Sequence, residues 1–347
     1  MLGTVRFILA FFVFISHFPQ NGLKINLGVV SVILFYFISG FLMEKSYLRF
    51  LEYSKNPAIE FYIDRFLKLF PQYLIILILT IISIRHFGNS ELITLFNQKI
   101  TVDKIFINTI LVLNNYIFEP FSINALIPHP IVPPTWSLST EIHFYLLLPL
   151  IFYLHKKVAL ILFISLIIQF SSFFFSDGNF NSNNFGYRYI FGVLTVFIYG
   201  YSFSRRKDQF FRTLSKFIWI NFSVFLFIVL PAFNLWRNPL VQEVIIGGFI
   251  ALPLGYALVY LKLESNFFRK LDILLGSLAY PIFISHFLAI YLVEKLSSIK
   301  IISPLFYMLS VTLCFIISFF LHFFQLYIEK FRTKKRGFES LREKELG

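Results

Sequence analysis

The stretch MLGTVRFILAFFVFISHF (residues 1–18) is the starting point, because this hydrophobic run carries an Arg at position 6 and a His at position 17. Eleven residues make about three helical turns, so in a helix Arg6 and His17 share one face, about 16 Å apart along the axis. A charged side chain within a hydrocarbon core costs about 2.5 kcal/mol or more. Taken singly, the Arg could snorkel and the His could be structural. Their shared face favours a functional site that opens into a cavity.

The composition is that of a membrane protein with many spans. Of the 347 residues, 57% are hydrophobic, and the mean hydropathy is +0.75, values well above those of soluble domains. The first run lacks a strongly basic start and a small-residue cleavage site, so we expect a retained span rather than a signal peptide. We predict an all-α transmembrane bundle of about ten spans, at residues 5–20, 27–43, 69–87, 137–154, 158–175, 187–203, 217–235, 240–261, 272–294 and 304–327.

The charge distribution predicts the orientation of the bundle. The formal net charge is +13, and most of the 31 Lys and Arg residues fall in one set of loops and in the C-terminal tail. Cytoplasmic loops carry such an excess, so both termini are predicted to be cytoplasmic. This topology accounts for the positive charge without nucleic acid as a partner. We expect a single transmembrane domain over residues 1–330 and a basic cytoplasmic tail over residues 331–347.

The longest outer stretch, residues 88–136, contains two unusual segments. Residues 105–118 (IFINTILVLNNYIF) are apolar but too short for a confident span, so an interfacial or re-entrant helix is expected. The segment PHPIVPPTW (residues 128–136) is rich in proline. It predicts either a rigid turn before the next span or a lid over an outward cavity.

Two further spans carry polar residues near their middle or cytoplasmic ends. In FYFISGFLM (residues 35–43), Ser39 and Gly40 allow another helix or a ligand to approach the backbone, or they mark a packing kink. In FYIDRFLKLFPQY (residues 61–73), Arg65 and Lys68 share a helix face. Their two positive charges could bind phosphates or lipid headgroups, or simply set topology.

The densest polar cluster is TWSLSTEIHFYLLLPL (residues 135–150). Trp136 begins the span as interfacial aromatics do, and Ser137 is a further candidate for the site. Glu141 lies about one turn into the apolar region, where a carboxylate needs a partner unless it remains solvated at the interface. His17 is an available partner.

Two later motifs add one candidate each. In GYRYIFG (residues 186–192), Arg188 begins a span and either anchors it or belongs to the site. In GSLAYPIFISHF (residues 276–287), His286 is a second imidazole deep within a span.

Six of these motifs together resemble the acyltransferase 3 family of bacterial integral-membrane O-acyltransferases, in its stand-alone form without a fused hydrolase-like domain. They are RFILAFFVFISH, FYFISGFL, RFLKLFP, WSLSTEIHFYLLLP, RYIFG and GSLAYPIFISH, in this order. Arg6 and His17 match the family's first pattern, a basic residue followed by ten residues and a His. The second pattern, Arg-x-x-Arg, is met by Arg65 but has Lys68 at its last position, which keeps the charge and loses the planar bidentate fork.

The resemblance implies transfer of an acyl group, usually acetyl, from cytoplasmic acyl-CoA to a hydroxyl of a surface glycan or lipid-linked saccharide. Acetyl-CoA is then the co-substrate, no metal is expected, and the protein lies in the bacterial inner membrane. CoA phosphates would bind Arg65 and Lys68, with Arg6 deeper in. His17 would act as the general base on the acceptor hydroxyl, or form an acyl-His intermediate, and Glu141 would orient or charge-stabilise it.

Two other classes fit a chain with many spans. A glycan or lipid transporter should show internal repeats and broken helices, and we see no convincing repeat between the halves. A glycan polymerase or ligase typically has large outer loops with Arg clusters, whereas the outer loops here hold few Arg residues. Binding of acyl-CoA and release of its thiol separates an acyltransferase from both.

Overall fold

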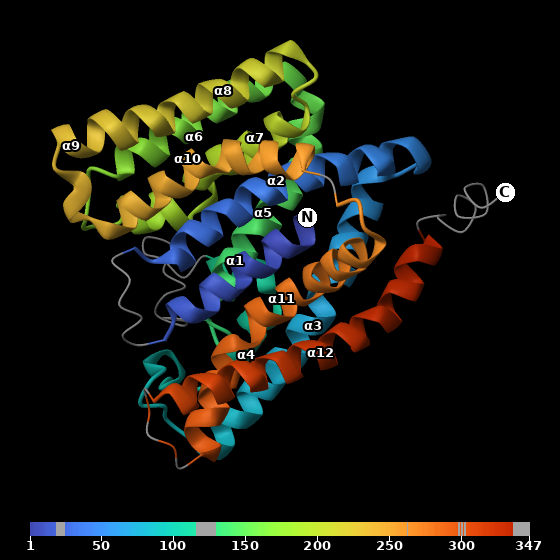
Figure 1. Cartoon of the computed structure of the whole chain (residues 1–347), viewed down its shortest axis with the longest axis vertical. Helices are drawn as coiled ribbons and strands as arrows, with labels where there is room; N and C mark the ends of the chain where they lie inside the picture. Colours follow the sequence, from blue (N-terminus) through green and yellow to red (C-terminus); the bar gives the residue numbers. More distant parts are fainter. Residues whose placement is uncertain are drawn as a thin grey trace.

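The computed structural model describes residues 1–18, 25–115, 130–261, 263–297, 299, 301 and 303–335. Across these residues the chain is helical and contains no strand, which confirms the predicted all-α bundle (Figure 1). The α-helices are α1 (Leu2–Ser16), α2 (Leu27–Tyr53), α3 (Pro57–Phe87), α4 (Val102–Thr109), α5 (Thr135–Leu154), α6 (Val158–Ser172), α7 (Ile190–Ser204), α8 (Gln209–Val224), α9 (Leu230–Ala232), α10 (Pro239–Tyr260), α11 (Asn266–Leu296) and α12 (Pro304–Lys335).

Within the described residues, each predicted span overlaps a helix. In the described part of the chain, 7 helical stretches are long and apolar enough to cross a membrane, and one of them, Thr135–Ser172, joins α5 and α6. Helices α1 and α7 have 15 residues each and are apolar but shorter. The count of ten spans and the cytoplasmic position of the termini therefore stay predictions. Helix α3 begins earlier than expected, because it runs through Pro71 without a break and includes Arg65 and Lys68.

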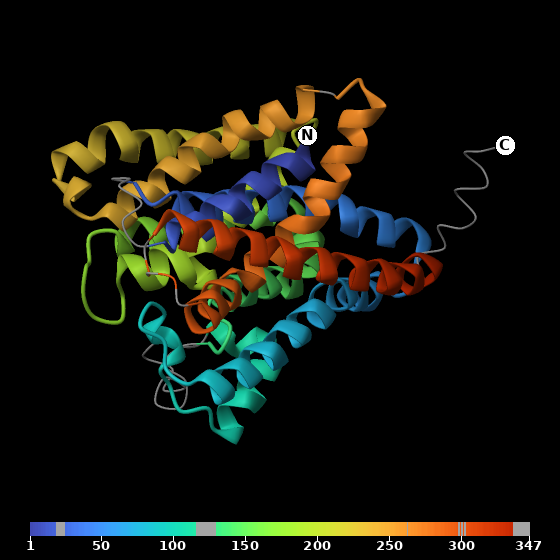
Figure 2. The same cartoon turned by 60° about the horizontal axis from the view of Figure 1, so that its bottom comes forward.

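Helix α2 lies at the centre of the bundle, between α7 on one side and α1 on the other (Figure 1). Turning the molecule shows α1 still in contact with α11, which packs in turn on α12 (Figure 2). Helices α6 and α8 pack on α7, and α10 packs on both α2 and α8, so these helices lie away from α11 and α12 (Figure 1). The five helices α1, α2, α3, α5 and α11 thus meet around the middle of the structure.

Glycines allow close approach at two helix crossings. A Cβ atom built on Gly40 of α2 would lie 2.0 Å from the carbonyl oxygen of Phe197, and one built on Gly200 of α7 would lie 1.9 Å from that of Phe37. Helices α1 and α11 cross in the same way at Gly3 and Gly276, where Gly276 would place its Cβ 2.7 Å from the Cα of Gly3. Only residues without a side chain allow backbones this close. The expected role of Gly40 in helix approach is confirmed.

An acidic residue of α11 fixes the beginning of α1. The Asp272 carboxylate accepts hydrogen bonds from the backbone N–H and the hydroxyl of Thr4, both 2.8 Å long. It also accepts from the Gly3 N–H at 3.2 Å. The first N–H groups of a helix have no partner within the helix, so a carboxylate at this end is stabilising. This contact sets the position of α1, and with it that of Arg6.

The short outer segment packs into the bundle. It forms α4 and a 3₁₀ turn at Leu111–Asn115, and the hydroxyl of Tyr73 on α3 donates to the Asn108 carbonyl at 2.6 Å. The Ile131 N–H donates to the Asn108 side chain at 2.9 Å, so residues 130–134 form a buried turn before α5. Residues 116–129 lie outside the described part of the chain, and with them the end of the predicted short helix and the beginning of the proline-rich segment. The lid interpretation therefore stays untested.

We predict that Gly200→Ala lowers the stability of the bundle by about 1–3 kcal/mol, because the added methyl group forces α7 away from α2. The chain has a single cysteine, the buried Cys314, so a thiol-reactive fluorogenic dye can follow thermal unfolding in detergent. Enlarging Leu160, which is 67% exposed, to Phe is the control and should leave Tm unchanged. Equal Tm values for wild type and Gly200→Ala would contradict the close crossing.

Candidate active site

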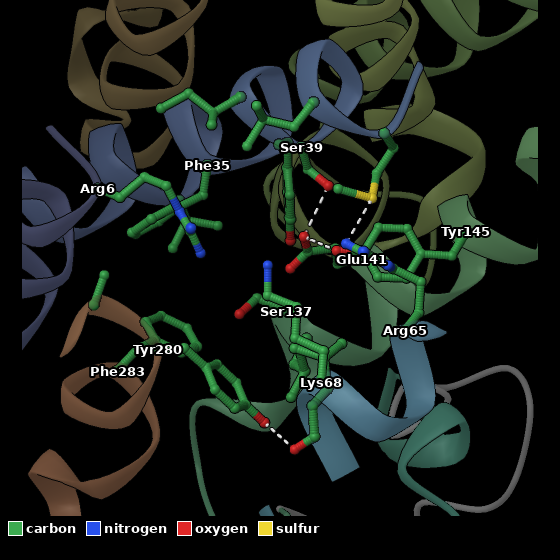
Figure 3. A pocket seen from close by; sticks show the side chains of 18 residues that line it. Arg6, Phe35, Ser39, Arg65, Lys68, Ser137, Glu141, Tyr145, Tyr280 and Phe283 are labelled. Carbon is green, nitrogen blue, oxygen red and sulfur yellow. Dashed lines mark hydrogen bonds between the residues drawn. The ribbon is translucent and has the colours of Figure 1, made fainter. Parts of the chain in front are cut away.

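A cavity with charged walls lies where α1, α2, α3, α5 and α11 meet (Figure 3). Six of the residues singled out from the sequence line it, namely Arg6, Ser39, Arg65, Lys68, Ser137 and Glu141. The rest of the wall is mostly apolar or aromatic, and it includes Phe35, Tyr145, Tyr280 and Phe283. The structure thus brings the six candidates together, although Arg6 and Glu141 are 135 positions apart in the sequence.

Two cations of this cavity have no anionic partner in the described chain. Arg6 reaches the cavity from α1 and Lys68 from α3 (Figure 3), and no hydrogen bond or ion pair joins either side chain to a described residue. The Lys68 ammonium is also subject to the positive charges of Arg65, Arg6 and Arg332, which the more weakly acting Asp64 carboxylate opposes. Cations gathered in a low-dielectric site repel one another unless an anion neutralises them. The cavity is therefore suited to bind an anionic group.

Arg65 differs from these two cations because it is neutralised. Its guanidinium donates from Nε to Asp64 at 2.9 Å, and Nη2 donates to the same carboxylate. The Nη1 group contacts the sulfur of Met43 at 3.4 Å. Only part of this guanidinium is thus available to a ligand.

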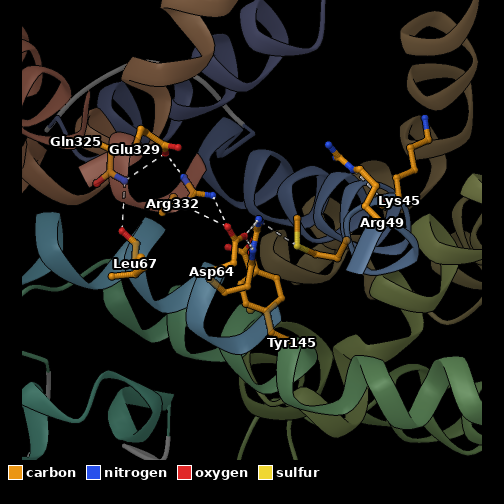
Figure 4. Close-up of polar contacts among 11 residues, drawn as sticks. Lys45, Arg49, Asp64, Leu67, Tyr145, Gln325, Glu329 and Arg332 are labelled. Atoms are coloured by element: carbon orange, nitrogen blue, oxygen red, sulfur yellow. Dashed lines mark hydrogen bonds and ion pairs between the residues drawn. The ribbon is translucent and has the colours of Figure 1, made fainter. Parts of the chain in front are cut away.

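Asp64 belongs to a buried network that extends to α12 (Figure 4). Arg332 donates to Asp64 from Nε at 3.2 Å and from Nη2 at 3.1 Å, and it is also ion-paired with Glu329. Gln325 links the same region to the Leu67 carbonyl of α3 at 3.3 Å. The sequence had placed Arg332 in a basic tail. The structure instead buries it within the bundle, since α12 continues past the predicted boundary at residue 330.

Glu141 accepts hydrogen bonds from two hydroxyl groups, one on α2 and one on its own helix. Ser39 on α2 donates to its carboxylate at 2.7 Å, and Tyr145, one turn further along α5, donates to the same oxygen. Ser137 turns back to its own helix and donates to the Pro134 carbonyl at 3.0 Å. The predicted pairing of Glu141 with His17 is therefore not formed.

His17 lies outside the cavity, at the far end of α1 from Arg6. Its side chain is exposed, and its ring stacks on that of His286, with the centroids 5.2 Å apart and the planes 17° apart. His286 is fully buried in α11. The two imidazoles that the sequence singled out separately thus form one pair.

Phe283 connects the cavity to this histidine pair. It lines the cavity, and its ring centroid is 6.3 Å from that of His286 and 6.0 Å from that of Phe35. Phe283 is thus the wall residue through which the cavity adjoins the histidine pair.

Trp136 and Arg188 form a separate contact next to the cavity. The Arg188 guanidinium lies 4.7 Å from the Trp136 ring centroid, and Tyr187 packs on the same indole at 5.0 Å. The Arg188 carbonyl accepts hydrogen bonds from Thr140 at 2.8 Å and Asn115 at 3.2 Å. These contacts tie α5 to the irregular turn that precedes α7, so they support an anchoring role.

An apolar groove lies on the other side of Arg65 and Tyr145. Its walls come from α3, α5 and residues 109–112. Phe66 and Leu146, two of its lining residues, are 53% and 48% exposed. Exposed apolar side chains of this kind are typical of a lipid-facing surface. Among the residues that the structure describes, no group of three or more His, Cys, Asp and Glu side chains is placed to hold a metal ion.

An all-helical bundle with several apolar helices of spanning length defines a multi-pass membrane protein, and this one has an internal cavity lined by cations. The family model of the acyltransferase domain matches residues 2–323, and the chain belongs to this family, acyltransferase 3. It is also 34% identical over 170 residues to an uncharacterized protein of Aquifex aeolicus (strain VF5), a match that covers 47% of this chain and 72% of that relative. No solved structure matches the chain significantly.

We predict that Asp64→Asn destabilises the protein by about 3–5 kcal/mol, because it removes the carboxylate that neutralises both Arg65 and Arg332. Thermal unfolding followed through Cys314 measures the change. The matched control is Asp177→Asn, at an exposed loop position, which should cost nothing measurable. Similar Tm values for the two variants would show that the buried network does not stabilise the contact between α3 and α12.

Proposed function

We propose that this acyltransferase moves an acyl group, acetyl in the first instance, from cytoplasmic acyl-CoA to a hydroxyl of a surface glycan or lipid-linked saccharide in the bacterial inner membrane. The observation that carries the proposal is the pair of cations, Arg6 and Lys68, without an anionic partner among the described residues of the cavity. CoA supplies several phosphates on a flexible arm. A site with uncompensated positive charge at one end of a narrow route suits such a donor.

The cations divide into two roles in this proposal. Lys68 and Arg6 supply the charge for the phosphates, because Asp64 already occupies most of the Arg65 guanidinium. A Lys at position 68 acts as a compact point charge and donates in many directions. Phosphate binding should therefore depend mainly on charge and should accept several phosphate orientations. A bidentate arginine contact would accept only one.

The chemical step takes place at His17, beyond Phe283. The acceptor hydroxyl attacks the thioester carbonyl carbon, and an imidazole nitrogen of His17 takes the hydroxyl proton. The tetrahedral intermediate then collapses, the C–S bond breaks, and the imidazolium returns the proton to the CoA thiolate. The products are the ester and free CoA. The exposed position of His17 suits an acceptor that arrives from outside the bundle.

Glu141 receives a role different from the one expected. Its carboxylate fixes the hydroxyls of Ser39 and Tyr145 at the cavity wall, so it shapes the route of the donor and does not orient His17. The predominance of basic residues in one set of loops supports a cytoplasmic entrance near Arg65 and Lys68.

We predict that His17→Ala abolishes acceptor-dependent release of thiol from acetyl-CoA, because the general base is lost, while binding of acetyl-CoA is retained. The measurement uses purified protein in lipid vesicles and a panel of glycan acceptors. His86→Ala, at an exposed position near the end of α3, is the control. Wild-type rates in His17→Ala would remove the general-base role. A wild-type protein that neither binds acetyl-CoA nor releases thiol would favour a transporter or polymerase.

We predict that Lys68→Ala weakens binding of acetyl-CoA about tenfold, which corresponds to about 1.4 kcal/mol, whereas Lys68→Arg keeps it near the wild-type level. Binding of S-acetyl-pantetheine, which lacks the CoA phosphates, should change little in either variant. Titration calorimetry in detergent gives both dissociation constants.

The exposed Lys207 provides a matched control, and Lys207→Ala should bind like wild type. An equal loss of both ligands in Lys68→Ala would show that Lys68 shapes the cavity and does not recognise phosphate.

A further inference from the structure

The hydrogen bonding of His286 fixes its tautomer. Its Nδ1 atom lies 3.2 Å from the carbonyl oxygen of Ile282, one turn earlier in α11. A carbonyl oxygen can only accept, so Nδ1 carries the proton and the lone pair of the neutral ring is on Nε2. The side chain is fully buried, and Nε2 has no hydrogen-bond partner in the described chain. A charged ring would be costly in this apolar setting, so His286 is a neutral imidazole.

The ring of His17 depends on its stacking contacts for its position. No hydrogen bond to a described residue holds either of its nitrogen atoms. It stacks on His286 with centroids 5.2 Å apart, and Phe287 packs against both imidazoles, 4.5 Å from His17 and 4.8 Å from His286. One side of His17 is thus supported by a buried aromatic platform of His286 and Phe287, and the remainder is exposed.

We propose that His286 is a positioning residue for His17: it holds the His17 ring by stacking and supports the imidazolium that forms when His17 takes the proton of the acceptor hydroxyl. The inference rests on the proposed acyl transfer. A neutral aromatic ring stacked on a cation is favourable, increasingly so where water is excluded. His286 itself takes no proton, and the cycle is balanced as described above, since the proton of the hydroxyl leaves with CoA.

The stacked geometry also excludes direct proton transfer between the two histidines. Hydrogen bonds of imidazole lie in the plane of the ring, whereas the two planes here are 17° from parallel. The contact therefore acts through the ring faces, and a phenyl ring should replace it. The same argument predicts that an aliphatic side chain of similar volume should not replace this contact.

The test compares His286→Phe with His286→Leu in vesicles, using acetyl-CoA and a glycan acceptor that the wild type acetylates. Both variants lose the bond to Ile282, but only Phe keeps a stacking surface. We expect kcat to stay within about threefold of wild type for His286→Phe and to fall at least about tenfold for His286→Leu. The KM for acetyl-CoA should be unchanged in both, because the cations of the cavity are untouched.

A second measurement is independent of acyl transfer. Diethyl pyrocarbonate modifies exposed imidazoles, and peptide mass spectrometry gives the rate at His17. We expect severalfold faster modification in His286→Leu, where the ring is released, and the wild-type rate in His286→Phe. The modification rate reports the position of His17 even if the protein does not transfer acyl groups. A failure of this inference can therefore be distinguished from a failure of the proposed function.

Three outcomes would overturn the inference. Wild-type kcat and modification rate in His286→Leu would show that His17 needs no platform. An inactive His286→Phe with a normal modification rate at His17 would show that an imidazole nitrogen of His286 takes part in the reaction. A loss of acetyl-CoA binding or of Tm in His286→Leu, together with lost activity in both variants, would show a purely structural role.

Discussion

The arrangement of this protein depends on positive charge held inside an apolar bundle. Arg6 and Lys68 face one cavity with no anion among the described residues, while two other cations, Arg65 and Arg332, share the carboxylate of Asp64. The neutralised pair, Arg65 and Arg332, stabilises the contact of α3 with α12. Arg6 and Lys68 repel each other instead, and an anionic ligand would relieve this repulsion. The fold brings α2 close to α7 and α1 close to α11 through crossings at glycines, where backbones approach without side chains between them.

The sequence predicted much of the cavity because helical periodicity is reliable over one element. Arg65 and Lys68 were expected on one face of a helix, and both line the cavity. The order of motifs along the chain predicted the family, which the match over residues 2–323 confirms. These inferences needed only spacing within a helix and the sequence of motifs.

Contacts between helices were harder to predict. The sequence indicates how deep a residue lies in the membrane, but it does not indicate which helix packs beside that residue. Glu141 and His17 were expected to pair on the basis of depth, yet the carboxylate is bound by Ser39 from α2 and by Tyr145 from its own helix. The Tyr145 contact has the i, i+4 spacing that the sequence could have suggested. The role of Asp64 was missed, since neighbours in sequence rarely face each other and its second partner, Arg332, comes from the other end of the chain.

The two phenyl rings between the cavity and the histidine pair have a consequence for the membrane itself. An enzyme that joins a cytoplasmic donor to an acceptor outside must not become a leak for protons or ions. Phe35 and Phe283 line the cavity with their ring centroids 6.0 Å apart, and the stacked imidazoles lie next to Phe283. In the proposed cycle, this aromatic surface would plug the donor's route when no donor fills it. In the proposed cycle, a thin pantetheine arm would displace these rings and take their place as the seal. The membrane would thus remain insulating in both states.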